Sequence, residues 1–180
     1  MDTREAELIA RVLVQDDRHA FAELVKLHQS ALRAFLRRLV RGDHAFADDL
    51  AQESFIEAYR NLSSFRGDAP FKTWLFGIAY NRFRQSLRAR REQPVGPDLA
   101  LLQTDAESPV PASDLRHDLG EALAELRAEE RTALQLCYGE GLSHEEAARV
   151  MGCPLGTVKS LVLRAKQRLR GLLDAYSSTS

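Results

Sequence analysis

The chain has 180 residues, of which 44% are hydrophobic, and a formal net charge of −1. This length allows one domain or two small ones with packed cores, and the near-zero net charge says nothing by itself about a nucleic-acid partner. Two cysteines without neighbouring ligands exclude a zinc site and a disulfide framework. The absence of a signal peptide and of a long apolar run favours a cytoplasmic protein.

The spacing of apolar residues is helical throughout, which predicts an all-α protein. Proline and glycine are nearly absent before Gly67 apart from Gly42, which is expected to separate the second helix from the third. Turn residues in Asn61–Pro70 predict a loop, and Tyr176–Ser180 is expected to be a frayed tail. The predicted helices are Arg4–Val14, His19–Arg41, Asp43–Leu62, Phe71–Arg91, a segment resuming near Leu115, Ala128–Tyr138, and two helices within Ser143–Arg170.

A change of composition divides these helices into two groups. Residues 93–113 contain four prolines and little amphipathic order, which is typical of an extended, partly disordered linker. We therefore predict two small helical domains, residues 1–92 and 115–176, joined by a Pro-containing acidic linker at 93–114.

Charge is segregated along the chain even though its sum is close to zero. Residues 43–57 and 92–114 each carry five acids and no Lys or Arg, whereas residues 72–91 and 149–170 each carry six bases and no acid. Such blocks attract partners of opposite charge. The pattern predicts two basic sites, one acidic docking face and one acidic connector.

The helix predicted at Asp43–Leu62 has one apolar and one acidic side. Its apolar side holds Ala47, Ala51, Phe55, Ala58 and Leu62. A solvated surface would explain the acidic side. The alternative is a docking surface for a basic partner helix, with Ile56 as its apolar anchor.

The helix predicted at Phe71–Arg91 has three distinct stripes. An apolar stripe holds Phe71, Trp74, Leu75 and Ile78; a cationic stripe holds Thr73, Gly77, Asn81, Arg84, Arg88 and Arg91; a third holds Phe76, Tyr80, Phe83 and Leu87. Arginine can neutralise phosphates, asparagine can read a base edge, and exposed aromatic rings can stack on unpaired bases. In the alternative interpretation the aromatic residues form core on both sides of a central helix, and we expect this of Trp74 and Ile78.

The segment Ser143–Arg170 has the marks of a helix-turn-helix. Ser143 and Glu146 form a capping box, Gly152 suits the left-handed residue that ends the first helix, and Pro154 suits the start of the second. Apolar residues then recur at helical spacing with basic residues on the other faces. This arrangement places a second helix in the DNA major groove, although a helical hairpin with a solvated basic face is the alternative.

Both predicted domains together resemble the extracytoplasmic-function group of the sigma-70 family, the dissociable promoter-recognition subunits of bacterial RNA polymerase. The residues that carry the resemblance are Phe21–Leu24, Ala47–Tyr59, Phe65-Arg66, Phe71–Asn81, Leu142–Ala148 and Gly156–Ser160. The resemblance implies three partners. They are core RNA polymerase, bound through its β′ and β subunits, promoter DNA, and an anti-sigma protein. It implies no cofactor, no metal, no small-molecule substrate, no catalytic residue and no insertion into a membrane.

The resemblance also assigns residues to three surfaces. The face that binds core polymerase consists of Asp48, Asp49, Gln52, Glu53, Ile56 and Glu57. The surface that captures the −10 element, with a base flipped beside the loop, consists of Asn61, Ser63, Ser64, Phe65, Arg66, Lys72, Trp74, Tyr80, Asn81, Arg84 and Arg88. The −35 element is expected to contact Pro154, Thr157, Lys159, Ser160, Arg164, Lys166 and Arg168. The acidic linker resembles the connector that runs near the polymerase active site.

Two positions depart from the family pattern. Gln85 stands where the family often has Asp, and Leu161 stands where it often has Arg after the Thr-Val-Lys-Ser block. The loss of a cation at Leu161 either changes contacts to the −35 backbone or reflects a buried position.

Two other functions compete with promoter recognition as part of polymerase. A helix-turn-helix regulator acting without core polymerase would explain the C-terminal domain but not the acidic and aromatic surfaces of the first. An enzyme is disfavoured, because the five histidines are scattered and no nucleophile–base set, phosphate-binding loop or dinucleotide fingerprint is present.

Overall fold

The computed structural model describes residues 3–40, 43–92 and 122–177, and these ranges contain helices and turns but no strand. The all-α prediction is therefore confirmed. The helices form two compact units. Gly42, the linker and the helix start near Leu115 lie outside the described residues, and the predicted domain bounds stay predictions. No described helix is both long and apolar enough to cross a bilayer.

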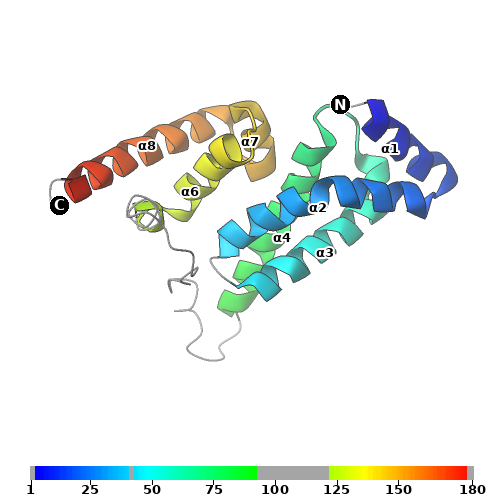
Figure 1. The fold of residues 1–180 in the computed structure, drawn as a ribbon, viewed down its shortest axis with the longest axis horizontal. Helices are drawn as coiled ribbons and strands as arrows, with labels where there is room; N and C mark the ends of the chain where they lie inside the picture. Colours follow the sequence, from blue (N-terminus) through cyan, green and yellow to red (C-terminus); the bar gives the residue numbers. More distant parts are fainter. Residues whose placement is uncertain (1–2, 41–42, 93–121, 178–180) are drawn as a thin grey trace. The chain divides into compact units, whose positions relative to one another are not determined.

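The first domain consists of four long helices and one short 3-10 turn. They are α1 (Thr3–Gln15), α2 (Arg18–Val40), α3 (His44–Arg60), η1 (Leu62–Ser64) and α4 (Phe71–Glu92). Figure 1 shows α2 (blue) running beside α3 (cyan) and α4 (green), and all three pack against one another. Leu32, Phe35 and Leu36 of α2 are fully buried in this core, where the Phe35 ring stacks on that of Phe76 at 4.8 Å.

Side-chain caps fix where the helices of the first domain begin. Asp17 accepts hydrogen bonds from the backbone N–H groups of His19 and Ala20 at the start of α2, at 2.9 and 3.1 Å. Those bonds, with the nearby Arg11 guanidinium, lower the pKa of the Asp17 carboxyl. Asp43 accepts a bond from the N–H of Phe46 at 2.9 Å and so starts α3.

The second domain contains the predicted helix-turn-helix. Its elements are α6 (Ala128–Leu134), a π-helical turn η3 (Gln135–Gly139), α7 (His144–Met151) and α8 (Leu155–Ser177). The N–H of Glu146 donates to Ser143 Oγ at 3.2 Å, and the N–H of Ser143 donates to the Glu146 carboxylate at 2.8 Å, which confirms the capping box. Gly152 has a φ of +63° at the turn, as expected of the residue that ends α7.

The helix α8 is longer than the sequence predicted. Val158, Val162 and Ala165 are buried at the expected helical spacing. The helix continues through Ser177, so that the first two residues of the expected frayed tail are helical. The remaining residues of that tail, 178–180, lie outside the described residues.

Candidate nucleic-acid and protein interfaces

The acidic face of α3 is smaller than the sequence suggested. Its apolar side is buried as predicted, with Ala47, Ala51 and Ala58 at 1% exposure or less. Three acids of the opposite side are engaged within the domain, and their partners come from neighbouring helices. Asp48 accepts two hydrogen bonds from Arg37 of α2 at 3.1 and 3.2 Å.

The other two engaged acids share one arginine of α4. Arg82 Nη1 lies 2.7 Å from a Glu53 oxygen, and Arg82 Nε donates to Glu57. Sequence reasoning placed Arg82 in a basic run and missed this bridge, because no spacing rule relates residues 25 and 29 positions apart on different helices.

Three residues of the predicted docking face stay open. Asp49 and Gln52 are exposed and make no side-chain hydrogen bond or ion pair within the described part of the chain. Ile56 is 43% exposed and adds a large apolar side chain to this face. The three stand at i, i+3 and i+7 and therefore form one continuous stripe along α3.

An aromatic cluster supports the loop between α3 and α4. The Phe71 ring is fully buried and lies 5.7 Å from the Phe65 ring and 5.5 Å from the Trp74 ring. Phe65 and Trp74 are half-buried and lie 5.4 Å from each other. The loop is tied to η1 by a hydrogen bond from the Phe65 N–H to the Leu62 carbonyl at 3.0 Å. One buried ring thus holds two partly open rings in place.

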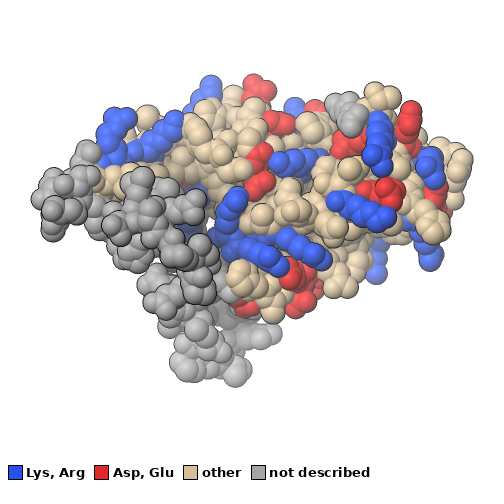
Figure 2. All heavy atoms as spheres, in the orientation of Figure 1, with Lys and Arg blue, Asp and Glu red and all other residues tan. Residues whose placement is uncertain are grey.

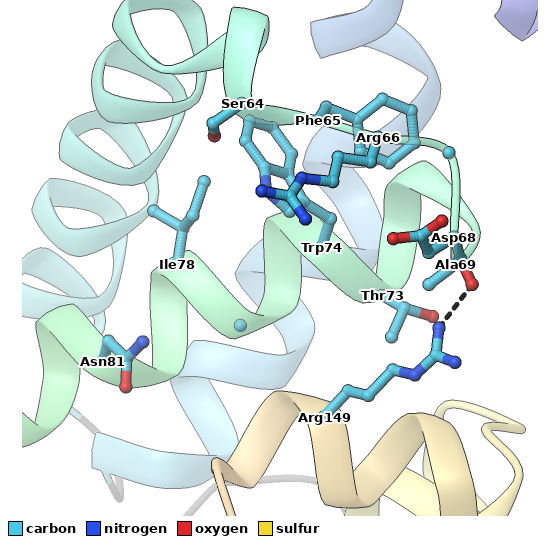
Figure 3. A pocket seen from close by; sticks show the side chains of 12 residues that line it. Ser64, Phe65, Arg66, Asp68, Ala69, Thr73, Trp74, Ile78, Asn81 and Arg149 are labelled. Carbon is cyan, nitrogen blue, oxygen red and sulfur yellow. Dashed lines mark hydrogen bonds between the residues drawn. The ribbon is translucent and has the colours of Figure 1, made fainter.

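Figure 3 shows how the loop and the first half of α4 line an open face. Phe65 and Arg66 extend over it from the loop, while Trp74, Ile78 and Asn81 line it from α4. This corrects one sequence expectation, because Trp74 and Ile78 were expected in the core and are half-buried on this face instead.

The third stripe of α4 provides much of the core that Trp74 and Ile78 were expected to form. Phe76 is fully buried and Tyr80 is 7% exposed, because α4 is a central helix and turns this side toward α2. The burial of Tyr80 counts against its predicted contact with DNA, which stays a prediction. Lys72 also lies away from the open face. Its ammonium is 5.3 Å from the centre of the Phe76 ring, and its position in α4 is on the opposite side of the helix from Asn81.

The remaining predicted −10 residues are exposed on the loop or along α4. Ser64 is held by a hydrogen bond from its Oγ to the Asn61 carbonyl at 2.7 Å. The guanidinium of Arg84 lies 5.9 Å from the Tyr80 ring centre. The exposed members of the set are Asn61, Ser63, Ser64, Arg66, Asn81, Arg84 and Arg88.

The predicted −35 residues separate onto different sides of α8. Pro154, Thr157 and Lys159 are exposed at its N-terminal end. Ser160 Oγ donates to the Thr157 carbonyl at 2.8 Å. Leu161 is 8% exposed, so of its two interpretations the buried one is confirmed.

The later cations of α8 divide between two neighbours. Arg164 and Arg168 lie beside Glu130 of α6. Arg164 Nε is 3.7 Å from Glu130 Oε1, and Arg168 Nη1 is 3.5 Å from Glu130 Oε2. The ammonium of Lys166 lies over the ring of Tyr138, 4.4 Å from its centre. Sequence reasoning missed both neighbours, since neither shares a helix with these cations.

Metal and thiol chemistry gains no support from the described residues. Within them no three His, Cys, Asp or Glu side chains lie close enough together to hold a metal ion. Burial raises the pKa of the Cys137 thiol, which makes it less reactive as a nucleophile.

Two family models and several curated relatives match this chain. Residues 24–93 match the model described as Sigma-70 region 2, and residues 116–169 match Sigma-70, region 4. The RNA polymerase sigma-H factor of Pseudomonas aeruginosa is 37% identical over 179 residues, covering 92% of each chain. The ECF RNA polymerase sigma-E factor of Haemophilus influenzae is 36% identical over 183 residues, covering 93% of this chain and 94% of the other.

Two solved structures have a similar fold. The sigma factor RpoE of Bartonella quintana, in complex with the anti-sigma factor NepR, matches with a TM-score of 0.69 and 34% identity, covering 86% of this chain and 96% of that one. CnrH in complex with the cytosolic domain of CnrY matches with a TM-score of 0.69 and 27% identity, covering 96% of this chain and 98% of that one.

Proposed function

The chain belongs to the extracytoplasmic-function group of the sigma-70 family and is an RNA polymerase sigma factor, and from this premise we propose how its surfaces divide the work of initiation. One surface binds core polymerase, a second captures the opened −10 element, and a third reads the −35 duplex. RNA synthesis itself belongs to the polymerase. The observation that carries this division is the open stripe of Asp49, Gln52 and Ile56, because DNA binding alone gives such a stripe no purpose.

We propose that this stripe is the centre of the core-polymerase interface. Ile56 supplies an apolar anchor and Asp49 supplies an unpaired charge for a basic partner helix. The engaged acids Asp48, Glu53 and Glu57 flank the stripe and contribute less, because a partner would have to displace an arginine from each.

The open face of the loop and α4 is proposed to hold unpaired −10 DNA. Phe65 and Trp74 offer partly exposed ring surfaces on which a base can stack. Asn81 offers hydrogen bonds to a base edge, while Arg84 and Arg88 are exposed for phosphates. A base flipped out of the stack would be held beside the loop, where Arg66 is also exposed.

The N-terminal end of α8 is proposed to enter the major groove at the −35 element. Thr157 and Lys159 are exposed there, and such residues of a recognition helix meet base edges and phosphates. Arg164 and Arg168 extend the contact along one side of the helix.

An anti-sigma protein is a further proposed partner. The sigma factor RpoE, which has a similar fold, was solved in complex with the anti-sigma factor NepR, and CnrH, also similar, with the cytosolic domain of CnrY. Such a partner would hold the free chain inactive by covering surfaces that polymerase needs.

Transcription in vitro with core polymerase on a genomic promoter library tests the proposed function. We expect initiation at promoters that share two short elements, and loss of initiation when the core-binding stripe is changed. A chain that binds duplex DNA but neither binds core nor starts transcription would instead be a helix-turn-helix regulator, which no observation favours.

A further inference from the structure

A buried acid lies beneath two of the arginines that we assign to the −35 interface. Glu130 is in the first turn of α6, and its side chain is 3% exposed. One carboxylate oxygen accepts a hydrogen bond from the backbone N–H of Arg127 at 3.3 Å, as part of the capping box that starts α6. A buried carboxylate needs its charge compensated, and one backbone amide does not do so.

The compensating charge comes from α8. Arg164 Nε lies 3.7 Å from one oxygen of Glu130, and Arg168 Nη1 lies 3.5 Å from the other. The two arginines stand one turn apart and therefore extend from the same side of the helix. Their side chains are 56% and 48% exposed, so each guanidinium can meet a ligand while it stays beside the acid. Arg164 approaches through Nε, which leaves its four terminal N–H donors outside this contact.

The pairing is selective among the cations of α8. Lys159 and Arg170 are exposed and have no ion pair within the described part of the chain. Lys166 lies over the Tyr138 ring and not beside an acid. Among the described residues, Glu130 thus pairs with two particular arginines of α8 and with none of its other cations.

We propose that Glu130 is a positioning residue that determines specificity at the −35 interface, a role that rests on the proposed function of α8. An arginine already held in one orientation loses less side-chain freedom when it binds, which favours the DNA sequence whose groups lie where that guanidinium is held. The negative charge of Glu130 also offsets part of the positive charge of the pair. This offset weakens the attraction to phosphates that all DNA sequences share.

The substitution Glu130→Gln separates these effects from a purely structural role. Glutamine keeps the size of the side chain and an oxygen that can accept the Arg127 N–H, but it removes the charge. Glu129→Gln is the matched control, because it removes the same charge from an exposed position one residue earlier in α6. Full-length variants are assembled with core polymerase. Their affinity is measured, as a function of salt, for a duplex that the wild-type holoenzyme selects from a random −35 library and for a scrambled duplex.

We expect Glu130→Gln to lower the ratio of selected to scrambled affinity about fivefold or more, in the range of one lost oriented arginine contact. Affinity for the scrambled duplex should stay the same or rise, with a steeper dependence on salt. Glu129→Gln should keep the wild-type ratio. Adding Arg168→Gln should lower the ratio less in the Glu130→Gln background than in the wild type, because the two residues act together.

An unchanged ratio in Glu130→Gln would overturn the proposal. So would an equal loss of affinity for both duplexes together with a lower midpoint of unfolding, since that result shows a structural role alone. If Glu130→Gln does not fold, Arg168→Gln on the exposed side of the pair decides instead: equal losses on both duplexes overturn the proposal, and a loss confined to the selected duplex supports it. A wild-type holoenzyme that selects no −35 sequence would remove the proposed function itself, which is a distinguishable result.

Discussion

Replacing Ile56 by alanine tests whether the open stripe of α3 binds core polymerase. Full burial of an isoleucine side chain contributes ~1.5–3 kcal/mol. Because 43% of Ile56 is exposed in the free chain, covering that part contributes roughly 0.6–1.3 kcal/mol. At ~1.4 kcal/mol for each factor of ten, we expect the Kd for core polymerase to rise about three- to ninefold. The rest of the side chain is covered within the free domain, so by the same arithmetic the free energy of unfolding should fall by roughly 0.9–1.7 kcal/mol.

The assay is a fluorescence titration of labelled full-length chain with core polymerase, accompanied by urea unfolding of each variant. Leu27→Ala is the matched control, since Leu27 is 48% exposed on α2 and lies outside the stripe. The reasoning is refuted if Ile56→Ala binds core as tightly as the wild type, or if Leu27→Ala weakens binding equally. A loss of unfolding free energy far beyond that of Leu27→Ala, in step with the loss of binding, would also refute it.

Four further substitutions test the first domain. Phe71→Ala should lower the free energy of unfolding by ~3–5 kcal/mol in urea titrations, because the ring is fully buried. Trp74→Ala should lower the free energy of unfolding by less but should slow promoter opening, which is measured by the fluorescence of 2-aminopurine placed in the −10 element. Arg82→Gln should lower the free energy of unfolding by less than about 1 kcal/mol, since the ion pairs of Arg82 with α3 are partly exposed. A larger loss would show that solvent screens these ion pairs less than expected. Asp17 has a lowered pKa chiefly because the Ala20 N–H donates to it; its stabilising effect is present above its unfolded pKa of about 3.9 and is lost as pH falls through the lower folded value. Urea midpoints between about pH 2 and pH 5 should therefore depend less on pH in Asp17→Asn.

The sequence identified most helices because their beginnings and ends depend on local chemistry. Asp43 and Ser143 bind backbone N–H groups within three residues of themselves, and Gly152 adopts the left-handed conformation that ends a helix. Such features need no knowledge of the tertiary structure. The end of α8 was missed because Gly171, a residue typical of helix ends, lies inside this helix, which continues through Ser177.

The orientation of α4 could not be predicted in the same way. The helix has apolar residues on more than one side, so periodicity identifies the stripes but does not say which of them meets α2. Packing decides the outcome, because the Phe76 ring stacks on Phe35. That contact buries the stripe of Phe76 and Tyr80 and leaves Trp74 partly open.

The segregation of charge along the sequence exaggerates the charge of each surface. A basic run and an acidic run attract each other as readily as they attract partners, and the fold brings α4 against α3 in this way in the first domain. Figure 2 shows basic and acidic side chains interleaved on one face of the molecule. Arg82 engages two acids of α3, and Glu130 engages two arginines of α8.

The residues left over after this pairing are therefore more informative than the runs themselves. On α3 the remainder is one acid, one amide and one isoleucine, a stripe too small for long-range charge to give it specificity. Its selectivity for a partner must come from a pocket that fits Ile56, with Asp49 fixing the register of the partner helix. Asp49→Asn should accordingly weaken core binding less at high salt than at low salt, whereas the effect of Ile56→Ala should be insensitive to salt. Titrations at about 50 and 500 mM salt separate the two contributions, and a salt-dependent effect of Ile56→Ala would show that the stripe is not an apolar anchor.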